Sequence, residues 1–195
     1  MGSLAEHCGV TRPSLIVVSG PPGSGKTTLA HTIAGLVSCP AICRDEIKEG
    51  MVHATPGFRP SPSDPLTVRT FTTFFEVLGL LLRAGVTVVA EAAFQDKLWR
   101  PHLEPLIHTA GIRVIACSVD PDVAHERIVR RFDGNPLARA AHADTALLRD
   151  RAAGSQTHDS FVHISLAVPT LQVDTSDGYR PELERIAAFA GTRST

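Results

Sequence analysis

The sequence of 195 residues lacks an excess of charge of either sign. Its 19 lysines and arginines nearly balance 20 aspartates and glutamates, and the formal net charge is −1. Proteins that grip a nucleic-acid backbone use a basic surface to neutralise its phosphates. We therefore do not expect a nucleic-acid partner.

The sequence also lacks the marks of export and of membrane insertion. The longest apolar stretches fall short of the roughly 20 residues that cross a bilayer. The four cysteines, Cys8, Cys39, Cys43 and Cys117, form no CxxC pair, and the N-terminus has no basic stretch followed by an apolar one. We expect a reduced, cytoplasmic protein with no membrane contact.

Histidine and lysine are informative for opposite reasons. The nine histidines show no HExxH or similar ligand spacing, so a zinc site is not expected. Lysine is scarce, because only three of the 19 basic residues are lysine. One of these three, Lys26, lies in the most distinctive segment of the chain.

The sequence alternates short apolar runs with segments in which apolar residues recur at helical spacing. The patterns predict strands at about 15–19, 41–43, 86–90, 113–118 and 170–173. They predict helices at about 26–37, 45–52, 66–83, 99–110, 121–131, 144–153 and 181–189. This order favours an α/β fold of three layers, with a parallel five-stranded sheet between helices, in one domain of residues 1–195. We expect residues 1–12 to be flexible.

The segment GPPGSGKT, residues 20–27, follows the first predicted strand and opens a helix. It satisfies GxxxxGK[ST], the phosphate-binding loop. Glycines let backbone amides surround a triphosphate, Lys26 reaches the β and γ phosphates, and the Thr27 hydroxyl ligates Mg²⁺. The cofactors expected are ATP and Mg²⁺. The residues expected to bind them here are Gly23, Ser24, Gly25, Lys26, Thr27 and Thr28.

Two other classes of nucleotide-binding protein fit poorly. A GTPase usually carries an NKxD element, but the sole asparagine is Asn135, which Pro136 follows. A ring-forming ATPase needs a longer chain for its helical lid. Phosphoryl transfer to a bound acceptor becomes the leading class.

Four segments together resemble a known group of enzymes. GPPGSGKTTLA, then RDEIK, VVAEAAF and ERIVRR, are similar to the small P-loop kinases. That group includes polynucleotide 5′-kinases, chloramphenicol phosphotransferase, zeta-toxin-like kinases and many predicted kinases of the AAA type. The resemblance covers about residues 14–190. It implies the P-loop NTPase fold and a small lid at about 132–143.

The resemblance also implies an acceptor site after the second strand. Asp45 matches the general base of the polynucleotide kinases, although a helix N-cap would place the same residue there. Arg44 and Lys48 are candidate substrate contacts, with a solvated helix face as the alternative. Glu91, where the group usually has aspartate, is expected at the end of the third strand, serving either Mg²⁺ or the acceptor. Arg59 is a further substrate candidate.

The remaining candidates lie in the second half of the chain. Arg127 and Arg131 are expected to be catalytic and Arg130 to contact the nucleotide, because guanidinium groups stabilise charge on a transferring phosphoryl group. A helix C-terminus also favours basic residues without such a role. The loop after the last strand is expected beside the adenine, with Asp174 and Thr175 as contacts, unless these residues simply form a turn.

The sequence therefore predicts a kinase that moves the γ-phosphoryl group of ATP to a hydroxyl of a small molecule, such as an antibiotic or a nucleoside. Two alternatives stay open at this point. One is a nucleotide-dependent switch without an acceptor, and the other is a toxin-like kinase of a nucleotide sugar. The expected oligomeric state is monomer or homodimer.

Overall fold

The computed structural model describes residues 12–59, 64–134, 141 and 161–191. A five-stranded sheet in the order β2-β3-β1-β4-β5 forms its centre, and every pairing is parallel. The strands are β1 (Ser14–Ser19), β2 (Ala41–Cys43), β3 (Val88–Ala92), β4 (Gly111–Ser118) and β5 (Thr170–Asp174). The predicted α/β class and parallel five-stranded sheet are thereby confirmed.

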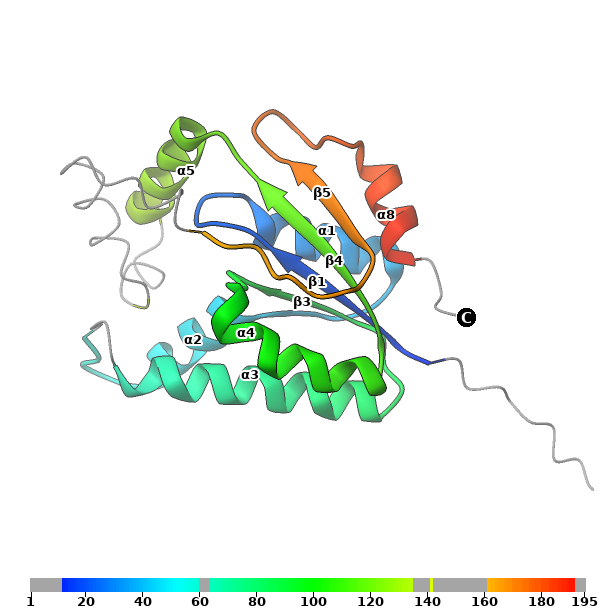
Figure 1. The fold of residues 1–195 in the computed structure, drawn as a ribbon. Helices are drawn as coiled ribbons and strands as arrows, with labels where there is room; N and C mark the ends of the chain where they lie inside the picture. The colour runs from blue at the N-terminus through cyan, green and yellow to red at the C-terminus, as the bar shows by residue number, and fades with distance from the viewer. Residues whose placement is uncertain (1–11, 60–63, 135–140, 142–160, 192–195) are drawn as a thin grey trace, which may run out of the picture.

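Helices cover both faces of the sheet, as Figure 1 shows. Alternate side chains of a strand point to opposite faces, so Ile16 and Val18 of β1 join one core and Leu15 and Val17 join the other. Helices α1 (Lys26–Val37) and α8 (Leu183–Gly191) pack on the first face. Helices α3 (Pro65–Arg83) and α4 (Asp96–Leu103) pack on the second. The result is the predicted three-layer arrangement.

Local sequence explains where the helices begin and end. Helix α1 follows Gly25 and ends at Ser38, whose positive φ of 58° closes the last turn before Pro40. Asp64 caps α3 by accepting a hydrogen bond from the Thr67 backbone amide at 2.9 Å. The remaining elements are α2 (Arg44–His53), the 3-10 helix η1 (Glu104–His108) and α5 (Pro121–Gly134).

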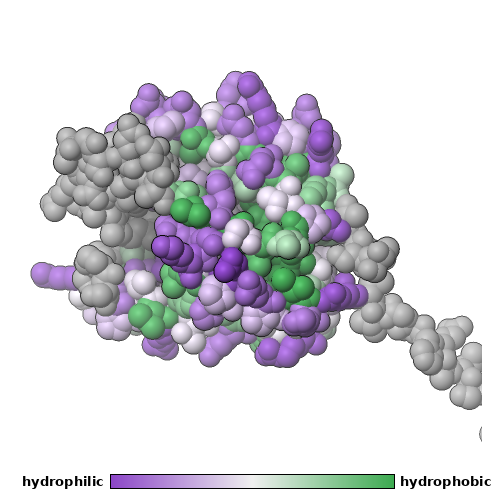
Figure 2. All heavy atoms as spheres, viewed as in Figure 1, coloured by the Kyte–Doolittle hydropathy of each residue, from purple (hydrophilic) through white to green (hydrophobic). Residues whose placement is uncertain are grey.

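Helix α3 is, by length and composition alone, apolar enough to cross a membrane, contrary to the expectation from the sequence. In the structure it packs on the sheet through Phe74, Leu78 and Leu82, which are at most 2% exposed. Its opposite side carries exposed Glu76 and Arg83. Figure 2 shows hydrophilic residues over most of the α3 and α4 side of the molecule. One side of α3 therefore packs on the sheet, while Val68 and Leu80 of the same helix are exposed.

Three predicted boundaries were wrong. The third strand begins at Val88 and runs through Glu91, so that Glu91 lies inside the strand. The helix expected at 99–110 is split, because Pro105 has no amide hydrogen and the chain continues as η1. Helix α5 extends to Gly134, into the start of the predicted lid. The rest of that lid, except residue 141, and the helix expected at 144–153 lie outside the described residues.

Candidate nucleotide and phosphoryl-transfer site

The loop between β1 and α1 makes close backbone contacts that only glycine permits. Gly23 and Gly25 have positive φ angles of 77° and 67°. A Cβ atom on Gly23 would lie 2.6 Å from the Ala124 carbonyl oxygen of α5, and one on Gly20 would lie 2.7 Å from Ser24 Oγ. The loop is therefore packed tightly against its surroundings, in the conformation that turns backbone amides toward a phosphate.

Lys26 and Thr27, at the start of α1, converge on Glu91 of β3. Lys26 Nζ lies 3.7 Å from Glu91 Oε1, and the Thr27 hydroxyl donates a hydrogen bond of 3.1 Å to Glu91 Oε2. Lys26 is 6% exposed and Glu91 is 1% exposed. Strand pairing brings Glu91 close to the loop. Glu91 is in register with Val18 of β1, one residue before that strand ends and the loop begins.

The surroundings of Glu91 fit a divalent cation. Burial raises the pKa of Glu91, Lys26 lowers it, and the charge of Asp45 raises it further. Glu91 Oε1 and Ser24 Oγ are buried and have no hydrogen-bond partner among the described residues. A carboxylate and a hydroxyl are oxygen ligands of the kind that Mg²⁺ takes. Glu91, with the Thr27 hydroxyl that contacts it at 3.1 Å, is suited to hold the ion, directly or through water.

Asp45 lies in the first turn of α2, directly after β2. Strand β2 pairs with β3, and the Cys43 that ends β2 is in register with Glu91. Asp45 is close enough to Glu91 for its charge to affect the Glu91 pKa. Arg44 Nη1 donates to Asp45 Oδ1 at 2.9 Å, and about a third of the Asp45 side chain is exposed. The fold therefore brings Asp45 to the same edge of the sheet as the phosphate-binding loop.

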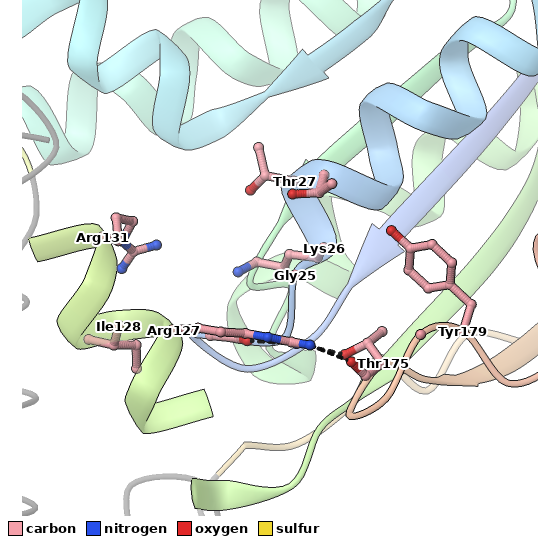
Figure 3. Close-up of a pocket in the computed structure, with 11 residues that line it drawn as sticks. Gly25, Lys26, Thr27, Arg127, Ile128, Arg131, Thr175 and Tyr179 are labelled. Atoms are coloured by element: carbon pink, nitrogen blue, oxygen red, sulfur yellow. Dashed lines mark hydrogen bonds between the residues drawn. The ribbon is translucent and has the colours of Figure 1, made fainter. Parts of the chain in front are cut away.

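A cavity of about 510 Å³ opens beside the loop. In Figure 3, Lys26 and Thr27 lie on one side of this space, Arg127 and Arg131 of α5 on another, and Tyr179 on a third. Its lining residues come from α1 with its loop, from α5 and from the segment after β5: Gly23, Gly25, Lys26, Thr27, Thr28, Arg127, Ile128, Arg131, Thr175, Gly178 and Tyr179. This is the position, beyond the carboxyl ends of parallel strands, at which such sheets bind ligands.

Arg127 joins two walls of the cavity. Its Nη2 donates to the Thr175 carbonyl oxygen at 2.7 Å, and its Nη1 lies 3.4 Å from the Gly23 carbonyl oxygen. It thereby ties the phosphate-binding loop to the segment after β5. Arg131 lines the cavity, whereas Arg130 is exposed and is not part of the lining. The catalytic roles of Arg127 and Arg131 stay predictions, as does the nucleotide contact of Arg130.

The structure gives different surroundings to the two predicted adenine contacts, Asp174 and Thr175. Thr175 lines the cavity, but its hydroxyl is 2.8 Å from the Ser24 carbonyl oxygen and is buried. Asp174 accepts hydrogen bonds from the amide and hydroxyl of Ser176, which makes it a turn residue. Tyr179, which the sequence reasoning missed, is the aromatic ring at this wall. It is the sole tyrosine of the chain and stands next to the Asp-Gly turn, a signal that was available.

None of the predicted acceptor-side residues lines this cavity: Arg44, Asp45, Lys48, Arg59 and Glu91 are all absent from its lining. Lys48 Nζ donates to Asp64 Oδ2 at 3.0 Å and to the Thr67 hydroxyl at 2.9 Å, which ties α2 to α3. Lys48 is 6% exposed, so its ammonium group is engaged in this ion pair and is shielded from solvent. Arg59 is exposed, at the end of a described stretch. A role for Lys48 or Arg59 in substrate binding stays a prediction.

Comparisons with known proteins agree with this geometry. The AAA domain family matches residues 15–154. An uncharacterised protein of Mycobacterium tuberculosis is 30% identical over 179 residues, which cover 78% of this chain and 36% of the relative. The chain thus spans about a third of the length of the curated relatives that it matches.

Solved structures show the same fold. A protein from Chloroflexus aurantiacus, proposed to be a kinase, superposes with a TM-score of 0.74 at 24% identity, covering 94% of this chain and all of that one. The APS kinase of M. tuberculosis, in complex with AMPPNP and APS, gives 0.61 at 15% identity, with 93% and 99% covered. The chain belongs to the AAA domain family and has the fold of the small P-loop kinases.

Proposed function

We propose that the chain is an ATP-dependent kinase that phosphorylates a hydroxyl group of a small molecule. One observation carries the proposal: Lys26 and Thr27 contact Glu91, and Asp45 lies within electrostatic reach of the same carboxylate. Donor and acceptor groups therefore stand at one edge of one sheet. Asp45 supplies the carboxylate that could receive the proton of an acceptor hydroxyl.

The donor side is proposed to hold the triphosphate of ATP. The amides of residues 23–28 and the Lys26 ammonium group would bind its β and γ phosphates at the start of α1, where the helix dipole favours negative charge. Thr27 and Glu91 would hold Mg²⁺ or its water shell. When bound, the ion neutralises charge on the phosphates.

The acceptor side is proposed to depend on Asp45. The acceptor oxygen forms a bond to the γ-phosphorus while the bond to the β-phosphate oxygen breaks and ADP leaves. The hydroxyl proton passes to the Asp45 carboxylate. Arg44, which donates to Asp45 at 2.9 Å, would hold that carboxylate in position.

Arginines of α5 are proposed to stabilise the charge that develops during transfer. Arg131 lines the cavity opposite Lys26, and a guanidinium group there suits the oxygens of the moving phosphoryl group. Arg127 is engaged with the Gly23 and Thr175 carbonyl oxygens, so it would act first by fixing the walls of the cavity. Tyr179 is proposed to pack against the adenine ring.

The acceptor is proposed to be a small molecule, such as a nucleoside or an antibiotic. The balanced charge of the chain argues against a polynucleotide. The free thiols of Cys39, Cys43 and Cys117, within the described residues, agree with a reducing compartment, and we propose the cytoplasm.

A screen of acceptors tests the proposal. The protein is incubated with ATP, Mg²⁺ and panels of small alcohols, nucleosides, aminoglycosides and chloramphenicol-type antibiotics. A gain of one phosphoryl mass in an acceptor is expected with the wild type and with Lys97→Ala, in which an exposed lysine is changed, but not with Lys26→Ala.

Other outcomes separate the alternatives. Normal ATP binding with no phosphorylated product in any panel would contradict the kinase and favour the nucleotide-dependent switch. Growth arrest on expression, absent for Lys26→Ala, would instead identify a toxin-like kinase of a nucleotide sugar.

A further inference from the structure

Three side chains of different chemistry meet on the α1 side of the sheet, behind the proposed acceptor site. His31 comes from α1, Cys43 ends β2, and Glu46 lies in the first turn of α2. His31 Nε2 is 2.6 Å from Glu46 Oε1 and 3.7 Å from Cys43 Sγ. One nitrogen, one sulfur and one oxygen atom all lie within 4.8 Å of one another.

These separations are close to those around a tetrahedral metal ion. Bonds of about 2.0 to 2.3 Å to zinc place neighbouring ligand atoms about 3.3 to 3.6 Å apart. The sulfur and nitrogen atoms, 3.7 Å apart, are close to this spacing, and the sulfur and oxygen atoms lie within 4.8 Å of each other. The nitrogen and oxygen atoms, 2.6 Å apart, need to separate by about 0.7 Å. The side chains that would move are about half exposed, at 51% for His31 and 48% for Glu46.

The charge around the cluster favours a cation. Cys43 is 2% exposed, and its Sγ atom lies within 4.8 Å of the Glu46 carboxylate. The negatively charged Glu46 carboxylate would attract a divalent ion, and the ion would displace the thiol proton of Cys43 on binding. The half-exposed His31 and Glu46 give such an ion a path from solvent.

We propose that His31, Cys43 and Glu46 bind a zinc ion, with a fourth position open to water. Thiolate and imidazole ligands select zinc over Mg²⁺ or Ca²⁺, which prefer oxygen alone. The site adjoins the proposed Mg²⁺ ligand Glu91, whose carboxylate contacts the Cys43 thiol. It shares no ligand with the proposed Mg²⁺ site and does not depend on the kinase proposal. The three ligands come from three different elements, which explains why the sequence shows no recognisable histidine spacing.

The position of the ion suggests its effect. It would link α1, which follows the phosphate-binding loop, to α2, whose first turn contains Asp45. Because Glu46 is a ligand and the next residue to Asp45, the ion would fix the first turn of α2. A metal at this point is therefore expected to stabilise the fold.

Cobalt substitution tests the site directly. Co²⁺ bound by a thiolate gives a charge-transfer band in the near ultraviolet, whereas Co²⁺ bound by oxygen ligands does not. The full chain, freed of metal and kept reduced, is titrated with Co²⁺ and then with Zn²⁺. We expect the band to saturate at one Co²⁺ per chain and to disappear on addition of one equivalent of Zn²⁺.

Variants assign the ligands. Cys43→Ser is expected to abolish the band, and His31→Ala, at an exposed position that the fold tolerates, to weaken Co²⁺ binding at least tenfold. Cys39→Ser and His108→Ala serve as controls and should keep the wild-type band. No band with the wild type, or a band that survives both Cys43→Ser and His31→Ala, would overturn the proposal.

Discussion

Gly23 shows at the scale of one residue why the phosphate-binding loop tolerates so little change. Its φ angle is 77°, and a Cβ atom would lie 2.6 Å from the Ala124 carbonyl oxygen. Gly57 is a matched control, because its φ is 76° but nothing lies within 4 Å of the position of its Cβ. Gly57→Ala should therefore cost only the strain of a left-handed conformation, roughly 1 kcal/mol.

Gly23→Ala should lower the free energy of unfolding by about 1 to 3 kcal/mol more than Gly57→Ala, because the added methyl group must also push α5 away. Urea denaturation without nucleotide measures both variants. Equal losses would show that the approach of the loop to α5 is not tight.

At the scale of elements, the pair of Lys48 and Asp64 fastens α2 to α3. Burial alone would raise the pKa of Asp64, but hydrogen bonds from Lys48 and Thr67 outweigh it and hold the pKa below its ordinary 3.8. A carboxyl group with a lowered pKa stabilises the fold above its unfolded pKa. This contribution is lost as the pH falls through the lower, folded value.

Lys48→Met leaves the buried carboxylate without its cation, so near pH 7 we expect a loss of about 3 to 5 kcal/mol in the free energy of unfolding. The difference from wild type should shrink below about pH 4, where Asp64 begins to be protonated in the unfolded chain. Denaturation between pH 7 and pH 3 measures this. Arg100→Met, which removes exposed ion pairs, should show little change. If the difference in unfolding free energy between Lys48→Met and wild type does not vary with pH, the proposed stabilisation of Asp64 by Lys48 is contradicted.

The same scale shows what the sequence could and could not predict. Residues 20–27 are contiguous, so their spacing alone predicted the loop, and Lys26 and Thr27 lie in the cavity as expected. The third strand was predicted at 86–90 but runs from Val88 to Ala92, because periodicity does not place a buried glutamate inside a strand. Glu91 is tolerated there since Lys26 and Thr27, distant in sequence, contact it. The pairing of Lys48 with Asp64 and the cluster around Cys43 also depend on contacts between elements, which periodicity does not encode.

At the scale of the whole molecule, two apolar cores hold the sheet, and the cavity lies at the edge where β1, α5 and the segment after β5 meet. A ligand that bridges these parts should stabilise the fold as a unit. At 100 times its dissociation constant, ATP with Mg²⁺ should add about 2.7 kcal/mol. For a chain of this length that corresponds to a rise in Tm of roughly 5 to 10 °C.

Lys26→Ala should lose most of this rise, because it removes the cation that meets the β and γ phosphates. Lys97→Ala, at an exposed position on α4, should keep it. Differential scanning fluorimetry with and without ATP and Mg²⁺ gives the comparison. An equal rise in Lys26→Ala would place the nucleotide elsewhere.

Phosphoryl transfer by Asp45→Asn tests the central claim most directly, with an acceptor found in the screen and with ATP affinity measured in parallel. Glu49→Gln, on the same helix, is the control and should transfer phosphate at the wild-type rate. If Asp45 receives the acceptor proton, Asp45→Asn should bind ATP normally and transfer phosphate at least about 100-fold more slowly. Unchanged turnover in Asp45→Asn would contradict the account.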